Sequence, residues 1–531
     1  MNADSIRPVF HYRWPLRAML GRVLRLGVAG AMVGGFYVSY RDNDLKHLGV
    51  CRVARSAIAV GSIVIDYKAS FRNLKETDEQ YADTRHGFHQ RCAERLLKLC
   101  CANGGCYIKV GQHIAALEYL VPEEYTTTLK VLHANAPQST LSSVRKVIKE
   151  EFGKELEEIF EEFDEEPLGC ASLAQVHKAK LRTSENNNGG KTVAVKVQHN
   201  DVYQNSFTDM KVMELLGRLV DWGFPEFSLL WLVEETKINL PKELDFAHEA
   251  GNCIEAKKRL NHLPWLRVPF VWEQWTTRRV LVMDFEQGGF VNDKSYLLKH
   301  NLSPYKVVGR LGQMYSEMIF EQGFVHCDPH PGNILVNPNG DLILLDHGLY
   351  SRLSTKFREQ YARLWLAIID GDVKGIESVA IEMKVPANLT KIFTSIVAGR
   401  RWKAVAQGTL SQSGNASELR EIKEFASRHI DLINAVLRAV PREMLLLFKT
   451  NDLLRGIEAS LGTRHAAKSF VTMAQCCVRG VYARKLHEPK LLAVNRLMLH
   501  VQEWFYLIRI SIYQWLRWFM FTLADSFQFS K

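Results

Sequence analysis

V-H-C-D-P-H-P-G-N occupies residues 325–333, and L-L-D-H-G follows at residues 344–348. Together these stretches place a carboxylate at Asp328, an amide at Asn333 five residues later, and a second carboxylate at Asp346, 18 residues beyond Asp328. Transfer of a γ-phosphoryl group needs a carboxylate that orients the attacking oxygen and oxygen ligands that hold Mg²⁺ against the phosphates. The spacing therefore predicts Asp328 as the base and Asn333 and Asp346 as metal ligands, since Mg²⁺ prefers oxygen donors.

The residues before Asp346 predict a strand that would present it. Gly340 and Asp341 form a turn signal, and residues 342–345 form a short apolar run. The triplet at residues 346–348 taken alone is typical of an ordinary Asx turn. Its place at the end of a strand favours a metal ligand instead.

A third stretch, G-C-A-S-L-A-Q-V at residues 169–176, has the frame of the kinase phosphate-covering loop G-x-G-x-x-G-x-V. Alanine replaces the second and third glycines of that frame. Alanine disfavours the positive φ and close backbone approach that glycine permits, so we expect a stiffer cover that holds nucleotide in an altered pose. The residues expected to bind nucleotide here are Gly169, Cys170, Ala171, Ser172, Leu173, Ala174 and Val176.

A candidate phosphate-binding lysine follows this loop. V-A-V-K at residues 193–196 matches the kinase pattern V-A-I-K, and a hairpin signal at residues 186–190 precedes it. Two strands therefore bracket a turn, with Lys196 on the second. In isolation Lys196 could be an exposed strand lysine, but its apolar neighbours and its register with the loop favour the functional interpretation.

Further stretches match one group of atypical kinases. They are K-V-G-Q at residues 109–112, E-L-D at residues 243–245 with Glu249 and Asn252 after it, an alanine-rich loop at residues 167–177, and K-T-N-D-L-L-R-G at residues 449–456. With these motifs the chain resembles the UbiB/aarF-domain atypical kinases over roughly residues 45–465. Ordinary kinases lack a K-x-G-Q motif ahead of an alanine-rich loop.

The resemblance implies roles for several charged residues. Glu249 would pair with Lys196, and Glu243 and Asp245 would engage Lys109 from an N-terminal extension. In the family that extension packs over the region where a peptide substrate would otherwise lie. Without the resemblance, Glu243 and Asp245 could equally be solvated helix charges, whose exposed ion pairs contribute little.

The resemblance and the pattern also predict the hinge. Residues 280–285 are predicted as the strand that enters it, with Met283 as the gatekeeper and the backbone of Asp284 and Phe285 facing adenine. The cofactors implied are ATP and Mg²⁺.

The predicted fold is α+β, a two-lobed atypical protein-kinase-like fold with a β-rich smaller lobe and a helical larger lobe. A long helical insertion at residues 208–240 separates Lys196 from Glu249. The predicted segments are a targeting and anchor region (1–45), a helical extension (46–160), the smaller lobe (161–285), the larger lobe (286–465) and a helical tail (466–531).

Two features argue against ordinary protein kinase activity. A capped helix is predicted soon after Gly348, which leaves no room for a long activation loop, and no A-P-E follows. Cys327 replaces the usual catalytic-loop arginine, so nothing equivalent would read an activation-loop phosphate. The acceptor is therefore predicted to be a small molecule or lipid, or water in ATP hydrolysis, and a nucleotide-driven conformational switch is the remaining alternative.

The N-terminus predicts a mitochondrial location. Its first 25 residues contain one acid, Asp4, and five arginines, Arg7, Arg13, Arg17, Arg22 and Arg25. The uncharged run at residues 26–40 is shorter than the usual membrane span of about 20 residues, so a short anchor is expected. A secretory signal is the alternative, but the ten cysteines show no disulfide framework.

The composition and the C-terminal residues indicate which kind of partner the protein binds. The 531 residues are 47% hydrophobic and 24% charged, as in ordinary globular proteins. The formal charge of +10 predicts an anionic surface as partner, and mitochondrial lipid fits better than nucleic acid because no nucleic-acid reading motif is present. Eight aromatic residues interrupted by Arg509 and Arg517 at residues 504–523 suit either a membrane interface or a packed helix.

These observations predict a mitochondrial, inner-membrane-associated atypical kinase or ATPase. The resemblance ties it to coenzyme Q, lipid and cristae homeostasis, with lipid or small-molecule substrates and inner-membrane protein partners. One alternative is a small-molecule kinase like the aminoglycoside and choline kinases, which lack the extension that carries Lys109. The other is a nucleotide-sensing scaffold, for which Asp328→Asn would leave cellular function intact.

Overall fold

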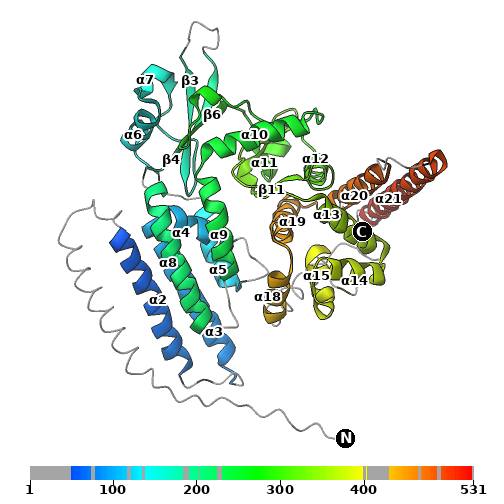
Figure 1. The fold of residues 1–531 in the computed structure, drawn as a ribbon, viewed down its shortest axis with the longest axis horizontal. Helices are drawn as coiled ribbons and strands as arrows, with labels where there is room; N and C mark the ends of the chain where they lie inside the picture. The colour runs from blue at the N-terminus through cyan, green and yellow to red at the C-terminus, as the bar shows by residue number, and fades with distance from the viewer. Residues whose placement is uncertain are drawn as a thin grey trace.

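A computed structural model describes most of the chain (Figure 1). The described residues are 49–72, 74, 78–115, 121–133, 138–182, 190–200, 202–223, 230–398, 402, 430–463, 468–486 and 492–528. The predicted targeting and anchor region at residues 1–45 and most of the predicted hairpin turn at residues 186–190 lie outside this set.

A bundle of helices forms the N-terminal part of the described chain. It contains α2 (Gly49–Phe71), α3 (Tyr81–Asn103), α4 (Gly105–Ala115), α5 (Glu123–Leu129), the 3₁₀ turn η2 (Lys130–His133), α8 (Val202–Gly223) and α9 (Leu230–Glu243). Figure 1 shows α2, α3 and α8 as long rods at one end of the molecule. Gly104, with φ of +65°, ends α3 and lets α4 turn back against it. The predicted helical insertion therefore belongs to this bundle.

Gly111 shows why the K-x-G-Q motif contains a glycine. It lies on α4 where that helix meets α3 and η2. A Cβ at this position would lie 2.4 Å from Leu132 Cδ1 and 3.1 Å from Cys100 Sγ, and both of these side chains are buried. The missing side chain thus permits the close approach of three elements, and it holds Lys109 two residues earlier in place.

The smaller lobe is an antiparallel sheet. Its strands are β1 (Phe160–Phe163), β2 (Gly169–Cys170), β3 (Ala174–Leu181), β4 (Thr192–Gln198) and β6 (Val280–Asp284), ordered β1-β3-β4-β6 with β2 on β3. Successive strand side chains point to opposite faces. Val193, Val195 and Val197 pack toward α6 (Leu141–Phe152), while Lys196 faces α10 (Phe246–Leu260).

The larger lobe is mainly helical. Its helices are α11 (Lys294–Lys299), α12 (Pro304–Ser316), α13 (Thr355–Asp370), α14 (Val373–Glu382), α15 (Thr390–Ala398), α18 (Ile430–Ala439), α19 (Arg442–Leu461) and α20 (Lys468–Leu486). A four-stranded sheet contains β5 (Leu266–Arg267), β10 (Leu342–Leu344), β9 (Ile334–Val336) and β7 (Gly289–Phe290), and a separate pair joins β11 (Tyr350–Arg352) to β8 (Phe324–His326). The α+β class and the two-lobed architecture predicted from the sequence are confirmed.

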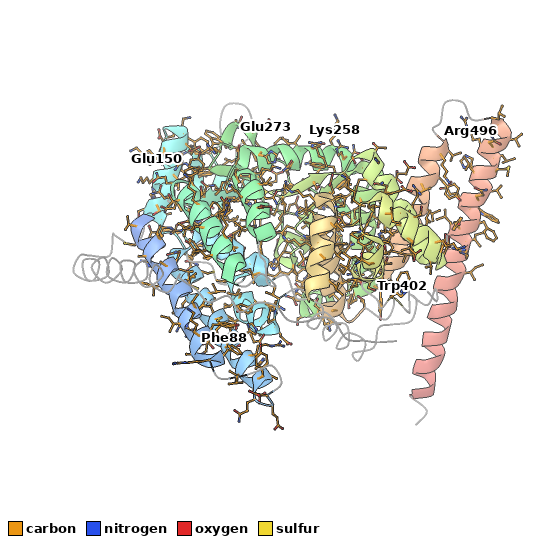
Figure 2. All side chains as sticks on the ribbon, turned by 60° about the horizontal axis from the view of Figure 1, so that its bottom comes forward. Phe88, Glu150, Lys258, Glu273, Trp402 and Arg496 are labelled. Carbon is orange, nitrogen blue, oxygen red and sulfur yellow. The ribbon has the colours of Figure 1, made fainter. Side chains whose placement is uncertain are left out.

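The C-terminal helix α21 (Ala493–Gln528) packs against α20, and its Tyr506 and Arg509 bond Asp370 of α13. Figure 2 shows the two helices side by side at the end of the molecule opposite Phe88, with Arg496 near one end of α21. Leu499, Leu507 and Ile510 lie in the contact with α20. Within the described parts of the chain, no helix combines the length and the apolar character that a membrane crossing requires.

Candidate functional site

Lys196 joins three elements of the site. Its Nζ lies 2.6 Å from Oε1 and 2.9 Å from Oε2 of Glu249, which α10 carries in its first turn. The same Nζ lies 2.8 Å from Oδ2 of Asp346, after β10. The pairing of Lys196 with Glu249 that the resemblance implies is therefore present, and it extends to the predicted metal ligand.

Burial and charge act in opposite directions in this cluster. Burial alone would lower the pKa of Lys196, but the carboxylates of Asp346 and Glu249 outweigh it and raise that pKa. Burial alone would raise the pKa of Asp346, but the Lys196 ammonium holds it below its usual range. For Glu249, which is almost fully buried, desolvation wins and raises the pKa. The ammonium thus holds the carboxylate of Asp346 ionised.

The loop that carries Asp346 is held by α10 as well as by its own turn. The N–H of Gly348 donates to Asp346 Oδ1 at 3.0 Å. The N–H of His347 donates to Glu249 Oε1 at 3.4 Å, and Asn252 Nδ2 donates to the His347 carbonyl at 3.0 Å. Asn252, which follows Glu249 in the family motif, therefore orients the backbone beside the predicted metal ligand.

The loop between β8 and β9 carries Asp328 and Asn333. The Asp328 carbonyl accepts bonds from the N–H of His330 at 2.7 Å and from Asn333 Nδ2 at 3.0 Å. Since the Asn333 nitrogen is bound to the backbone, its amide oxygen is the atom placed to receive a metal ion. An amide oxygen and the ionised carboxylate of Asp346 fit Mg²⁺, which takes oxygen ligands and keeps several waters. A bound Mg²⁺ would neutralise charge on the nucleotide phosphates.

Asp328 has a partner that the sequence analysis missed. Lys449 Nζ, from α19, lies 3.0 Å from Asp328 Oδ1. Burial alone would raise the pKa of Asp328, but Lys449 and Lys109 outweigh it and hold that pKa well below its usual range. Two sequence signals pointed to such a partner: the family motif K-T-N-D-L-L-R-G begins at Lys449, and no lysine or arginine lies between Asp328 and Asn333.

Lys109 brings the N-terminal extension to the site. Its Nζ lies 2.6 Å from Oε2 of Glu243 at the end of α9. Burial alone would lower the pKa of Lys109, but Glu243 first, and Asp328 and Asp346 after it, raise that pKa. Asp245 has a different place, because it is the N-cap of α10 and its carboxylate accepts from the N–H groups of Ala247 and His248.

The alanine-rich loop is a tight turn between β2 and β3. The N–H of Ala171 donates to the Ala174 carbonyl at 2.8 Å, and Gly169 pairs with Val176 in the sheet register. His199 holds the turn from the side, with its N–H donating to the Leu173 carbonyl at 3.0 Å. The Ser172 and Leu173 side chains are buried, and Leu173 belongs to the core of the N-terminal helical bundle. The turn is thus held by the His199 backbone and by the bundle core, and its role as a nucleotide cover stays a prediction.

The predicted hinge residues lie at the end of β6. Met283 is buried and pairs with Ala194 of β4. The N–H of Asp284 donates to the Phe270 carbonyl at 2.8 Å, and the N–H of Phe285 donates to the Thr192 carbonyl at 3.2 Å. Both N–H groups therefore have acceptors within the protein, and the contact of this backbone with adenine stays a prediction.

The segment after Gly348 is short. Strand β11 pairs with β8, with Tyr350 opposite His326, and α13 begins at Thr355. Ser354 is the N-cap of α13 and accepts from the N–H of Phe357. The capped helix after Gly348 is present as the sequence predicted, but the residues expected to form only a linker include strand β11.

Sequence comparison with known proteins identifies the family of this chain. The sequence profile of the ABC1 atypical kinase-like domain matches residues 131–380, a range that begins after the K-x-G-Q motif. AarF domain-containing protein kinase 1 of Gallus gallus is 44% identical, over 94% of this chain and 96% of that protein. AarF domain-containing kinase 1 of Drosophila melanogaster is 42% identical, over 93% and 96%. The ABC1 family protein MCP2 homolog of Schizosaccharomyces pombe is 36% identical, over 90% and 86%.

The identity of these relatives extends along nearly the whole length of both chains, so the extension and the tail are included with the two lobes. The family expected from the motifs is confirmed, and the chain belongs to the ABC1/AarF family of atypical kinases.

Proposed function

We propose that this atypical kinase binds Mg-ATP and transfers its terminal phosphoryl group to a small molecule, a lipid or water. The observation that carries the proposal is the position of Lys196, which bonds Glu249 and Asp346 at once. Such a lysine is placed to contact nucleotide phosphates while the carboxylate beside it holds the metal ion. Asn333 supplies the second oxygen ligand, and Asp328 orients the attacking oxygen.

Two features support a non-peptide acceptor. The segment after Gly348 enters β11 and α13 within a few residues and offers no long activation segment as a peptide platform. Lys109 of the N-terminal extension pairs with Glu243 at 2.6 Å, and the carboxylates of Asp328 and Asp346 also raise the pKa of this lysine, so the extension lies beside the site. This extension also distinguishes the chain from small-molecule kinases of the aminoglycoside and choline type.

We propose further that the protein acts at the mitochondrial inner membrane, on or near anionic lipid, in the coenzyme Q, lipid and cristae context that the resemblance implies. The support is the basic, acid-poor N-terminus, the charge of +10 and the outer face of α21. Large apolar side chains are exposed on that face at helical spacing, at Val494, Leu497, Met498, Val501, Trp504 and Phe505.

The first test is ATP turnover by the purified 531-residue chain. ADP release would be followed with and without Mg²⁺, and with vesicles that contain or lack cardiolipin. We expect Mg-dependent turnover that rises with the anionic vesicles. Tight binding of Mg-ATP without turnover under any of these conditions would instead support the nucleotide-sensing scaffold, and inner-membrane protein partners would then be sought.

The outer face of α21 can be tested separately. The triple change Leu497→Gln, Val501→Gln and Trp504→Gln should weaken binding to anionic vesicles at least tenfold, because burying each such apolar side chain contributes about 1.5–3 kcal/mol. The measurement is vesicle co-sedimentation. The matched control changes Leu298→Gln and Ile381→Gln, which are exposed on α11 and α14. Equal loss of binding in both variants would count against α21 as the membrane-contacting face.

A further inference from the structure

The loop that carries Asp328 holds no cation of its own. Its four residues before Asn333 are two prolines, His330 and Gly332. Burial lowers the pKa of His330, and its Nδ1 accepts from the N–H of Gly332 at 3.1 Å. The residue before Asp328 is the buried Cys327. Positive charge at the point of phosphoryl transfer must therefore come from another part of the fold.

Helix α19 supplies that charge. Lys449 lies 121 residues beyond Asp328 in the chain, yet its Nζ is 3.0 Å from Asp328 Oδ1. The exposed fractions of the two side chains are 21% and 22%, so both are partly buried and still reach solvent.

The packing of α19 makes Lys449 a fixed group. Met444, Leu447, Leu454 and Ile457 of this helix are buried in the core of the larger lobe. The two residues after Lys449 are also buried, and the second, Asn451, donates from Nδ2 to the Tyr361 hydroxyl of α13 at 3.0 Å. A cation on a packed helix is positioned before the reaction, which is the condition for strong electrostatic stabilisation.

We propose that Lys449 is a catalytic residue of the phosphoryl-transfer site and contacts the terminal phosphate of bound ATP. The inference rests on the proposed function. An ammonium has three N–H donors, so Lys449 can keep one bond to Asp328 and give another to a γ-phosphate oxygen. Lys196 would hold the phosphates from the smaller lobe while Lys449 holds the transferring group from the larger lobe.

In the transfer step one bond to the γ-phosphorus forms and one breaks. The attacking hydroxyl oxygen forms a bond to the γ-phosphorus. The bond from that phosphorus to the β–γ bridging oxygen breaks, and its electron pair stays on ADP. The proton of the attacking hydroxyl passes to the Asp328 carboxylate and then to solvent. Lys449 stabilises the charge on the transferring group throughout.

The test compares Lys449→Met, Lys449→Arg and a control, Arg455→Met, in the full chain. Arg455 lies on the same helix and bonds the Val397 carbonyl instead of a site carboxylate. Removing one preorganised electrostatic contact costs about 10²–10³ in kcat, so we expect that loss in Lys449→Met with a smaller change in KM. Lys449→Arg should restore part of the rate, and Arg455→Met should leave kcat unchanged.

Thermal unfolding separates catalysis from structure. Lys449→Met should unfold at the same temperature as the control Arg455→Met. A kcat equal to that of wild type in Lys449→Met would overturn the inference while leaving the proposed function intact.

If the wild-type protein shows no turnover, nucleotide binding tests the inference instead. Titration calorimetry with Mg-ATP and Mg-ADP should then show that Lys449→Met weakens binding of ATP at least tenfold and leaves binding of ADP unchanged, because only ATP carries the γ-phosphate. That result would support the phosphate contact although the proposed catalysis has failed. Equal weakening of both nucleotides, or of neither, would overturn the contact.

Discussion

Asp346→Asn should lower Mg-dependent ATP turnover by about 10²–10³-fold, the range for loss of one preorganised electrostatic contact. The change removes the negative charge that would hold Mg²⁺ and that Lys196 bonds at 2.8 Å. The fold should survive, because an asparagine keeps an oxygen for the N–H of Gly348. The measurement is ADP release at saturating ATP over a range of Mg²⁺ concentrations.

The matched control is Asp341→Asn, five residues earlier in the turn before β10. Asp341 pairs with Arg267 at 3.3 Å and with Arg310 at 3.6 Å instead of with Lys196. It should retain wild-type turnover. Turnover equal to wild type in both variants would contradict the assignment of Asp346 as a metal ligand.

Arg52→Met should lower the free energy of unfolding by about 3–5 kcal/mol, as expected when one partner of a buried ion pair is removed. Arg52 on α2 donates from Nε to Asp209 Oδ1 on α8 at 2.8 Å, and also to the Asn103 carbonyl. The exposed fractions of the two charged side chains are 5% and 2%. Burial raises the pKa of Asp209 even with Arg52 present, so the ionised carboxylate alone would be poorly tolerated.

Urea unfolding followed by far-UV circular dichroism measures the effect. The double change Arg52→Met with Asp209→Leu should recover much of the lost stability, because apolar residues often replace a buried ion pair without net cost. Arg91→Met, which breaks a more exposed pair with Asp66, should cost no more than about 1 kcal/mol. Equal losses for Arg52→Met and Arg91→Met would be inconsistent with a buried ion pair that joins α2 to α8.

The sequence predicted best those site residues that phosphoryl transfer requires at a short, fixed spacing along the chain. Asp328, Asn333 and Asp346 lie on loops bounded by short strands because turn residues and apolar runs alternate there. The pairing of Lys196 with Glu249 needed the resemblance, because 53 residues separate them. The contact of Lys449 with Asp328 was out of reach, since no periodic pattern reports a contact across 121 residues.

Two expectations met competing local interactions. Asp245 was expected to engage Lys109, but it directly precedes a helix, where a carboxylate readily accepts from exposed backbone N–H groups. At the predicted hinge, the N–H groups of Asp284 and Phe285 bond the Phe270 and Thr192 carbonyls, and the expected contact of this backbone with adenine is untested. Sequence alone does not show which neighbour a strand end will pair with.

Leu173 makes the alanine-rich loop and the N-terminal helices share one core, to which α3, α4 and α9 also contribute. If the loop covers nucleotide as proposed, its displacement on binding would disturb that core. By thermodynamic reciprocity, anything that biases the arrangement of these helices would then change nucleotide affinity by the same free energy with which nucleotide biases the helices. A single leucine would thus couple the helical bundle to the proposed nucleotide site.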